Sequence, residues 1–288
     1  MTRTWLKTDN LLNADTDVRG KTVFIYNRDP DDRGQLHGIG DALQHCRIAI
    51  KLKNEGAKRV IVQAQEPVLN LLRTIMGVDE AISFDAPIPS FDFHSPFFAY
   101  APRSAEQPYV QRIDSFFFAA DNYVSADPHK ILEWESRLGP KARPRIGVNW
   151  AASVSGKVTR SISFQEFKII LSDEFEFISL RPDCAEPTPG IRTFPGQTVS
   201  LDDVAAICML CDLVISVDTG LLHLAAALGR PAWGIIPVYP DWRWGQLEDK
   251  TVWYSRMKLY RQQQYLNWIA PLIAINHDLK ELLDETPF

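Results

Sequence analysis

The strongest constraint on the fold of this chain is a repeated alternation of short apolar strand patterns with helical patterns. Strand patterns rich in β-branched and aromatic residues lie at residues 21–27, 58–64, 80–85, 144–150, 175–181, 212–218 and 232–236. Helical patterns separate most of them. Parallel strands need crossovers, and a helix usually provides them. We therefore expect an α/β fold built from Rossmann-like, doubly wound parallel sheets.

The alternation runs twice, which predicts two domains in the 288 residues. It stops at Gly-Pro-Lys-Ala-Arg-Pro, residues 139–144, where two prolines and two cations interrupt any periodicity. We expect an N-terminal Rossmann-like domain, a linker, a C-terminal Rossmann-like domain and a C-terminal helical segment at residues 1–138, 139–144, 145–265 and 266–288, respectively.

Charge, cysteine content and hydropathy exclude several classes of protein. The net charge of −5 has the wrong sign for a general nucleic-acid or anionic-membrane binder, although a local basic groove stays open. Four cysteines are too few for a disulfide scaffold. Cys208 and Cys211 form a CxxC in an apolar helical pattern, which predicts burial. With no apolar run typical of a signal peptide or a membrane span, we expect a cytoplasmic protein.

The most informative local pattern is a strand that runs through a glycine turn directly into a helix, at residues 216–223. Ligands of open α/β sheets bind at the carboxyl ends of strands, and helix N-termini favour phosphate groups. We expect a diphosphate to contact Asp218, Thr219, Gly220 and Leu221, and we expect His223 to take part in donor binding. The alternative is that Asp218 and Thr219 only cap the helix and that His223 is a buried core histidine.

A similar glycine turn precedes the first expected helix. Gly38 and Gly40 permit a close approach of the backbone, and Asp41 stands at the start of the helix. Such a carboxylate either caps the helix or acts as a general base. A base in one domain and a phosphate site in the other, facing a shared cleft, would suit group transfer from a nucleotide-activated donor.

Two further loops carry side chains suited to an anionic donor. We expect Asn149, at the end of a strand, to contact the donor. Lys157 and Arg160 follow this strand, and they either clamp a diphosphate or lie in solvent. Trp242 and Arg243 follow the last strand pattern, and they either flank a base or sugar and its phosphates or pack against the C-terminal segment. The Asp-Pro-Asp-Asp at residues 29–32 is expected to be a solvated turn, so we expect no metal site.

Residues 212–233, Asp-Leu-Val-Ile-Ser-Val-Asp-Thr-Gly-Leu-Leu-His-Leu-Ala-Ala-Ala-Leu-Gly-Arg-Pro-Ala-Trp, resemble the signature of the heptosyltransferase-like glycosyltransferases, family 9. The chain is even more similar to the glycosyltransferase domains associated with tetratricopeptide-repeat proteins. Those domains share Pro-Asp-Trp-Arg-Trp at residues 240–244 and the Trp-Tyr-Ser-Arg-Met-Lys-Leu-Tyr-Arg-Gln run at residues 253–262. The resemblance covers residues 140–265 and, more weakly, residues 34–75.

The resemblance implies a GT-B fold, in which the C-terminal domain holds a nucleotide sugar and the N-terminal domain holds the acceptor. It also implies inverting, metal-independent transfer without a cofactor, with Asp41 as the base and the turn at residues 218–221 on the donor phosphates. Arg160 stands where the family usually has a lysine. The long insertion at residues 29–35 leaves the acceptor open.

The leading hypothesis is therefore an inverting glycosyltransferase. Its partners would be a nucleotide sugar and an acceptor glycan, protein or small molecule. A nucleotide-sugar epimerase of the same fold is one alternative, and a non-catalytic module that binds sugar nucleotides or serves as a scaffold is another.

Overall fold

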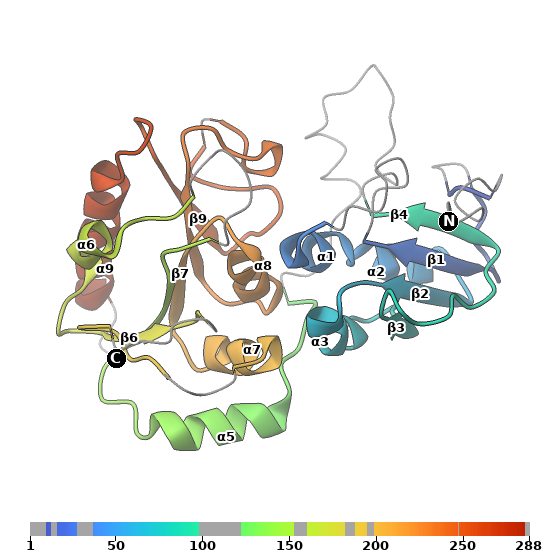
Figure 1. The fold of residues 1–288 in the computed structure, drawn as a ribbon, viewed down its shortest axis with the longest axis horizontal. Helices are drawn as coiled ribbons and strands as arrows, with labels where there is room; N and C mark the ends of the chain where they lie inside the picture. The colour runs from blue at the N-terminus through green and yellow to red at the C-terminus, as the bar shows by residue number, and fades with distance from the viewer. Residues whose placement is uncertain are drawn as a thin grey trace. The chain divides into compact units, whose positions relative to one another are not determined.

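A computed structural model describes residues 10–12, 16–27, 37–97, 122–152, 160–181, 188–194, 199–246 and 248–285. The chain divides into two compact units, Met1–Ser125 and Ala126–Phe288. Each unit contains its own parallel sheet, as Figure 1 shows. The α/β class expected from the alternation of patterns is confirmed. None of the described helices is both long and apolar enough to cross a membrane.

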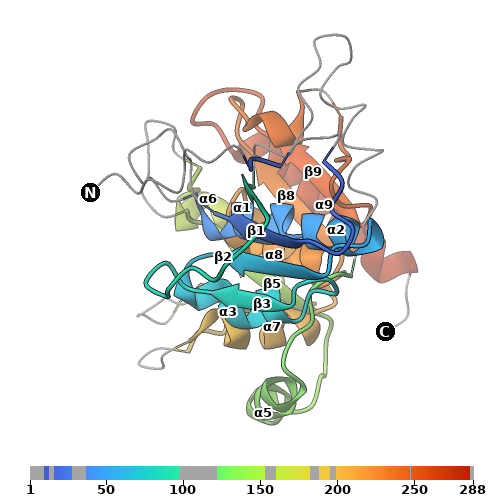
Figure 2. The same cartoon turned by 90° about the vertical axis from the view of Figure 1, so that its right-hand side faces the viewer.

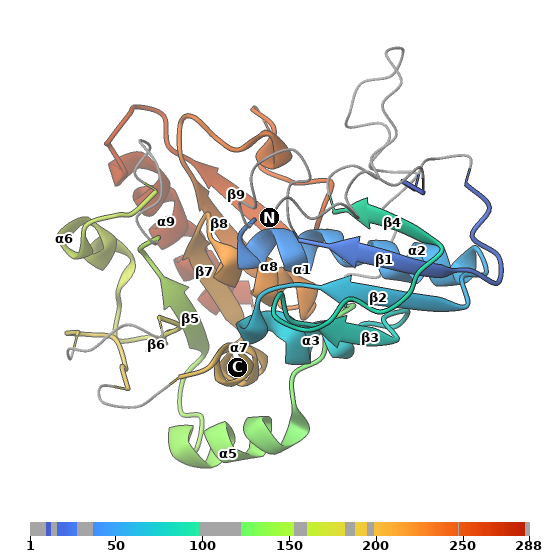
Figure 3. The same ribbon diagram turned by 45° about the vertical axis from the view of Figure 1, so that its right-hand side comes forward.

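The sheet of the first unit has four parallel strands in the order β3-β2-β1-β4 (Figures 2 and 3). Their bounds are Thr22–Tyr26 for β1, Arg59–Gln63 for β2, Glu80–Ile82 for β3 and Phe93–Pro96 for β4. The sequence does not predict β4, whose Phe-His-Ser-Pro lacks a run of β-branched residues. Its proline is tolerated because β4 lies at an edge of the sheet.

Short helices connect these strands. They are α1 (Ile39–His45), α2 (Ile48–Asn54), the 3-10 turn η2 (Glu66–Val68) and α3 (Leu69–Arg73). The buried core of the unit includes Phe24, Tyr26 and Ile61. The glycine turn at residues 38–40 thus lies where β1 gives way to α1, as the sequence indicates.

The sheet of the second unit has five parallel strands in the order β6-β5-β7-β8-β9 (Figure 3). Their bounds are Arg145–Asn149 for β5, Glu176–Ser179 for β6, Leu213–Val217 for β7, Ala232–Ile236 for β8 and Met257–Arg261 for β9. Strands β5 and β7 are buried along their whole length, which explains the apolar residues on both of their faces; their buried polar residues include Asn149 and Ser216.

Helices cover both faces of this sheet (Figure 1). They are α5 (Pro128–Leu138), α6 (Phe164–Phe167), α7 (Leu201–Met209), α8 (Gly220–Ala227) and α9 (Ile269–Glu285), with 3-10 turns η3 (Lys168–Ile170) and η4 (Trp242–Trp244). Gly234 on β8 lets α8 lie close, because a Cβ there would be 3.0 Å from Leu222 Cδ2. Cys208 is fully buried, and burial raises the pKa of its thiol to about 12, as expected for a core residue.

The two compact units divide before α5, whereas the sequence places the linker after it, at residues 139–144. The reason is a polar junction between α5 and α7, built on Asp203. Asp203 Oδ1 accepts hydrogen bonds from Lys130 Nζ at 2.6 Å and Trp134 Nε1 at 3.0 Å. Asp203 Oδ2 completes a capping box with Ser200 at the start of α7. The amphipathic α5 is thereby tied to the second unit.

The junction makes stability depend on pH. Burial raises the pKa of Asp203, but the hydrogen bonds from Lys130, Ser200 and Trp134 outweigh burial and hold this pKa well below its usual range. A carboxyl with a lowered folded-state pKa stabilises the protein above its unfolded pKa, about 3.9, and this contribution is lost as the pH falls further. Asp203→Asn should therefore lower the free energy of unfolding by about 1–2 kcal/mol at pH 7.

Urea unfolding at a series of pH values tests this prediction. The difference between wild type and Asp203→Asn should shrink below about pH 4. Glu135→Gln, on the exposed face of α5, is the matched control and should change little. A difference that is independent of pH would contradict the role of the ionised carboxylate.

Candidate functional site

The candidate site lies at the carboxyl ends of β5 and β7 in the second unit. These parallel strands are neighbours, and their register pairs Asn149 with Ser216. Helix α8 begins at Gly220, three residues after β7 ends at Val217. The parallel register therefore brings the end of one strand against the turn that follows the other, which is the usual position of a ligand in an open α/β sheet.

A closed hydrogen-bond network joins three side chains of this turn. Asn149 Nδ2 donates to Ser216 Oγ and to Thr219 Oγ1, at 3.0 Å each. Ser216 and Thr219 are themselves 3.2 Å apart, hydroxyl to hydroxyl. Asn149 is 1% exposed, so its side chain lies beneath the turn. Direct donor contact by Asn149 stays a prediction, and Ser216, which the sequence analysis missed, is a central member of the network.

The N-cap residue of α8, Thr219, does not cap its helix. The Thr219 side chain makes no cap hydrogen bond to the helix. The first amides of an α-helix have no acceptor within the helix and carry a partial positive charge. The amides of Gly220 and Leu221 can therefore serve an anionic group, and their contact with a donor stays a prediction.

A buried carboxylate and a partly exposed cation lie beside this turn. Arg160 Nη1 is 3.6 Å from Asp218 Oδ2, and the Arg160 side chain is 31% exposed whereas that of Asp218 is 7% exposed. Burial raises the pKa of Asp218, although the positive charges of Arg160 and Arg243 oppose the shift. Asp218 thus attracts Arg160 to the turn, while the guanidinium still reaches solvent.

His223 is a buried structural residue that ties α8 to the loop after β8. Its Nε2 lies 3.4 Å from Arg243 Nη1, and its Nδ1 lies 2.8 Å from the Tyr254 hydroxyl. A guanidinium only donates, so Nε2 is the acceptor and Nδ1 carries the hydrogen. The ring also stacks on Trp244, with centroids 5.2 Å apart. These contacts match the alternative of a buried core histidine, and a role of His223 in donor binding stays a prediction.

The loop after β8 presents both a buried cation and exposed aromatic rings. Arg243 Nε donates to Asp241 Oδ1 at 2.8 Å, and the Arg243 side chain is only 10% exposed. Trp242 packs edge-on against Trp253 and is 47% exposed. Trp242 is therefore accessible to a ligand, whereas Arg243 is engaged within the unit.

Asp41 lies in the first unit, at the start of α1. Its Oδ2 accepts a hydrogen bond from the Gly38 amide at 2.8 Å. Gly38 has no side chain, so it makes no reciprocal cap to the first turn of α1. Asn27, at the end of β1, donates to the Gly38 carbonyl at 3.2 Å and so fixes the turn. This contact of Asp41 with the helix start agrees with the structural alternative given by the sequence. The role of Asp41 as a base stays a prediction. Lys157 and residues 29–35 lie outside the described residues.

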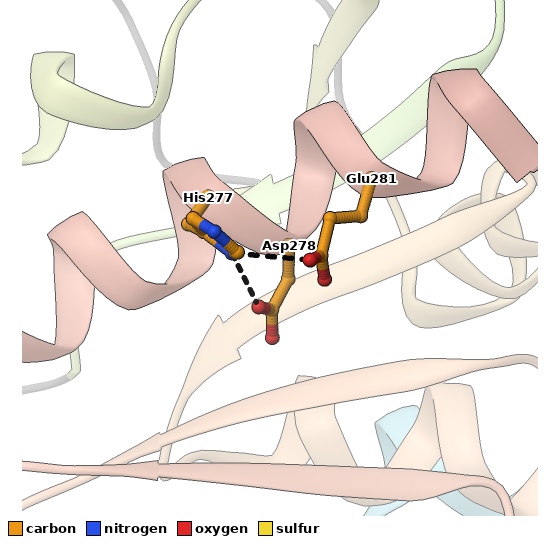
Figure 4. A group of neighbouring side chains, drawn as sticks. All are labelled: His277, Asp278 and Glu281. Carbon is orange, nitrogen blue, oxygen red and sulfur yellow. Dashed lines mark hydrogen bonds and ion pairs between the residues drawn. The ribbon is translucent and has the colours of Figure 1, made fainter.

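Among the described residues, one group of side chains brings potential metal ligands together: His277, Asp278 and Glu281 on α9 (Figure 4). His277 Nδ1 is 3.4 Å from Asp278 and 3.7 Å from Glu281. Asp278 also accepts hydrogen bonds from Lys258 and from Tyr260, the latter at 2.6 Å. Although burial raises the pKa of Asp278, these donors lower it overall. The ion pair with Lys258 and the hydrogen bond from Tyr260 fasten Asp278, and with it α9, to β9, whereas the contacts of His277 with Asp278 and Glu281 lie within α9.

Comparisons with known proteins agree with this architecture. Residues 194–265 match the model of glycosyltransferase family 9 (heptosyltransferase). Protein FlbA of Caulobacter vibrioides is 26% identical over 164 residues, which is 51% of this chain and 27% of FlbA. The chain thus spans about a quarter of the length of that relative.

Solved structures of similar fold cover nearly the whole chain. The family 9 glycosyl transferase of Veillonella parvula has a TM-score of 0.60 at 10% identity, covering 94% of this chain and 99% of that one. The ADP-heptose LPS heptosyltransferase II of E. coli has a TM-score of 0.60 at 13% identity, covering 92% and 99%. The dodecameric iron-containing heptosyltransferase TibC, solved with ADP-D-β-D-heptose, has a TM-score of 0.59 at 12% identity, covering 95% and 81%.

The two parallel sheets define an α/β protein of the GT-B class, with two Rossmann-like domains. Residues 194–265 are similar in sequence to glycosyltransferase family 9 (heptosyltransferase), and the chain as a whole is similar in fold to solved structures of that kind.

The structural role of His223 can be tested by stability. His223→Ala should lower the free energy of unfolding by about 2–3 kcal/mol, because it leaves a cavity beside Trp244 and removes the partner of Tyr254. Tyr254→Phe, which removes only the hydroxyl, should cost about 1 kcal/mol. Urea unfolding followed by tryptophan fluorescence measures both. His277→Ala, on the exposed face of α9, is the control and should stay within about 0.5 kcal/mol of wild type.

Proposed function

We propose that this protein transfers a sugar from a nucleotide-sugar donor to an acceptor hydroxyl, with inversion and without a metal ion. The observation that carries the proposal is the uncapped N-terminus of α8 beside the partly exposed Arg160. Backbone amides and a guanidinium are the groups that bind phosphate oxygens. The complex of TibC with ADP-D-β-D-heptose supports a donor of this kind.

The chemistry at the turn is the stabilisation of a leaving group. When the bond between the anomeric carbon and the donor phosphate breaks, negative charge develops on the departing nucleoside diphosphate. Hydrogen-bond donors that are fixed before the reaction stabilise this charge without reorganisation. Here they are the amides of Gly220 and Leu221 and the guanidinium of Arg160. Arg243, largely buried and 3.4 Å from His223, adds positive potential from behind α8.

Asp41 is the proposed base. In a single displacement, a base removes the proton of the acceptor hydroxyl while its oxygen attacks the anomeric carbon, which inverts the configuration. The hydrogen bond from the Gly38 amide fixes the carboxylate of Asp41, so the side chain is oriented before any acceptor arrives.

Donor binding tests the proposed site. Purified protein is screened by thermal shift against nucleoside diphosphates and their sugars, with and without a chelator. Binding to the native state should raise the unfolding midpoint. A shift that survives the chelator is expected, because the protein's own cation and amides take the place of a metal.

Arg160→Ala should lower the affinity for the ligand found in this screen about tenfold, which is the loss typical of one charge-assisted hydrogen bond. Arg143→Ala is the matched control, because Arg143 lies before β5, at the opposite end of the strand from the turn. Equal affinity of Arg160→Ala and wild type would remove Arg160 from the site. No shift by any nucleotide in folded protein would contradict the proposed function.

The base is tested by Asp41→Asn, which keeps an oxygen to accept the Gly38 amide. The turnover number should fall by about 10²–10⁴-fold, whereas the KM for the donor should stay close to that of wild type. Asp127→Asn, at the exposed N-cap of α5, is the matched control and should keep full turnover. An unchanged turnover number in Asp41→Asn would contradict the assignment of the base.

A further inference from the structure

The N-terminus of α8 departs from a local rule that most helix starts of its unit obey. Side chains at N-cap positions normally accept a hydrogen bond from an amide of the first turn, and threonine is well suited to this role. Four N-cap side chains in the second unit make this bond: Asp127, Ser163, Ser200 and Asp241. Thr219, with extended backbone at φ −148° and ψ 172°, makes none.

The cause lies in the two buried side chains that hold the Thr219 hydroxyl. Ser216 donates its hydrogen to the Val217 carbonyl at 2.8 Å, so its oxygen can accept from Thr219 Oγ1. Asn149 spends both hydrogens of its amide, one on Ser216 and one on Thr219. Ser216 is 0% exposed and Asn149 is 1% exposed. The network therefore pulls the Thr219 hydroxyl toward the ends of β5 and β7 and away from α8.

We propose that Ser216 and Asn149 are positioning residues, which hold Thr219 off the first turn of α8 so that its amides stay available to the donor diphosphate. This inference rests on the proposed function. A diphosphate that arrived at a capped helix would first have to displace the threonine hydroxyl. An N-cap bond is typically worth about 1 kcal/mol, which corresponds to about a fivefold loss of affinity.

The network also suits an anion because it is neutral. Asn149 supplies two donors without adding a negative charge, whereas the nearby Asp218 is already a buried carboxylate paired with Arg160. A second carboxylate at position 149 would repel a diphosphate. The uncharged side chains of Asn149 and Ser216 beneath the turn thus agree with their proposed role, which is to keep the backbone amides of α8 available to a phosphate.

The experiment compares Ser216→Ala in two backgrounds, with Thr219 intact and with Thr219→Val. Valine has the shape of threonine but no oxygen to cap the helix. Inorganic pyrophosphate, the group that nucleoside diphosphates share, is titrated calorimetrically into each folded protein. With Thr219 present, Ser216→Ala should weaken the binding of pyrophosphate about fivefold, because the released hydroxyl of Thr219 can cap α8. In the Thr219→Val background, the same substitution should change the affinity less than about 1.5-fold, because no competing cap exists.

A loss of affinity that depends on whether Thr219 is present distinguishes a positioning role of Ser216 from a role in stabilising the fold. Equal loss in both backgrounds, or no loss in either, would overturn the proposal. Ser179→Ala is the matched control: this buried serine ends β6, its Oγ accepts from the Arg181 amide, and its removal should leave pyrophosphate binding unchanged. If Ser216→Ala does not fold, Asn149→Ala is tested in the same two backgrounds with the same expectation.

Failure of the proposed function gives a different result. Wild-type protein would then fail to bind pyrophosphate, and both the site and the positioning role would be rejected together. Binding by wild type that weakens in Arg160→Ala but shows no background dependence would keep the donor site and reject the role of Ser216 and Asn149.

Discussion

The parallel register of β5 and β7 is the constraint on which the rest of the second unit depends. It sets Asn149 opposite Ser216 and thereby places one strand end beneath the turn that starts α8. Every other feature of the candidate site follows from this alignment. The hydroxyl of Thr219 is held away from the helix, the amides behind it stay open, and the loop after β5 brings Arg160 to the same edge.

Electrostatics at this edge come from groups that are fixed before a ligand arrives. Asp218 is buried, and its attraction for Arg160 keeps a cation near the turn while leaving the guanidinium partly exposed. Arg243 is held by Asp241 and lies against His223, so its charge is fixed behind α8. Preorganisation of this kind is what an enzyme needs to stabilise a charged leaving group, because no reorganisation is required during the reaction.

The two units differ in how their helix starts are built. In the first unit, the Asp41 carboxylate accepts a hydrogen bond from the Gly38 amide, and Gly38 has no side chain to cap α1 in return. In the second unit, Thr219 leaves α8 open. The first turn of α1 contains a carboxylate held in one orientation, whereas the first turn of α8 contains no acidic residue and suits an external anion. The contrast agrees with the division of labour that we propose, in which one turn orients a base and the other holds a phosphate.

The sequence by itself determined the α/β class, most strands and helices other than β4 and β9, and the turn at residues 218–221, because these depend on periodicity and on residues adjacent in the chain. It also indicated both alternatives for Asp41 and His223. Only the tertiary structure decided that His223 is enclosed by Arg243 and Tyr254, that α5 packs on α7, and that Ser216 and Asn149 restrain Thr219. These facts escape the sequence because each joins residues that are distant in the chain, and only packing determines which hydrogen bond a side chain makes.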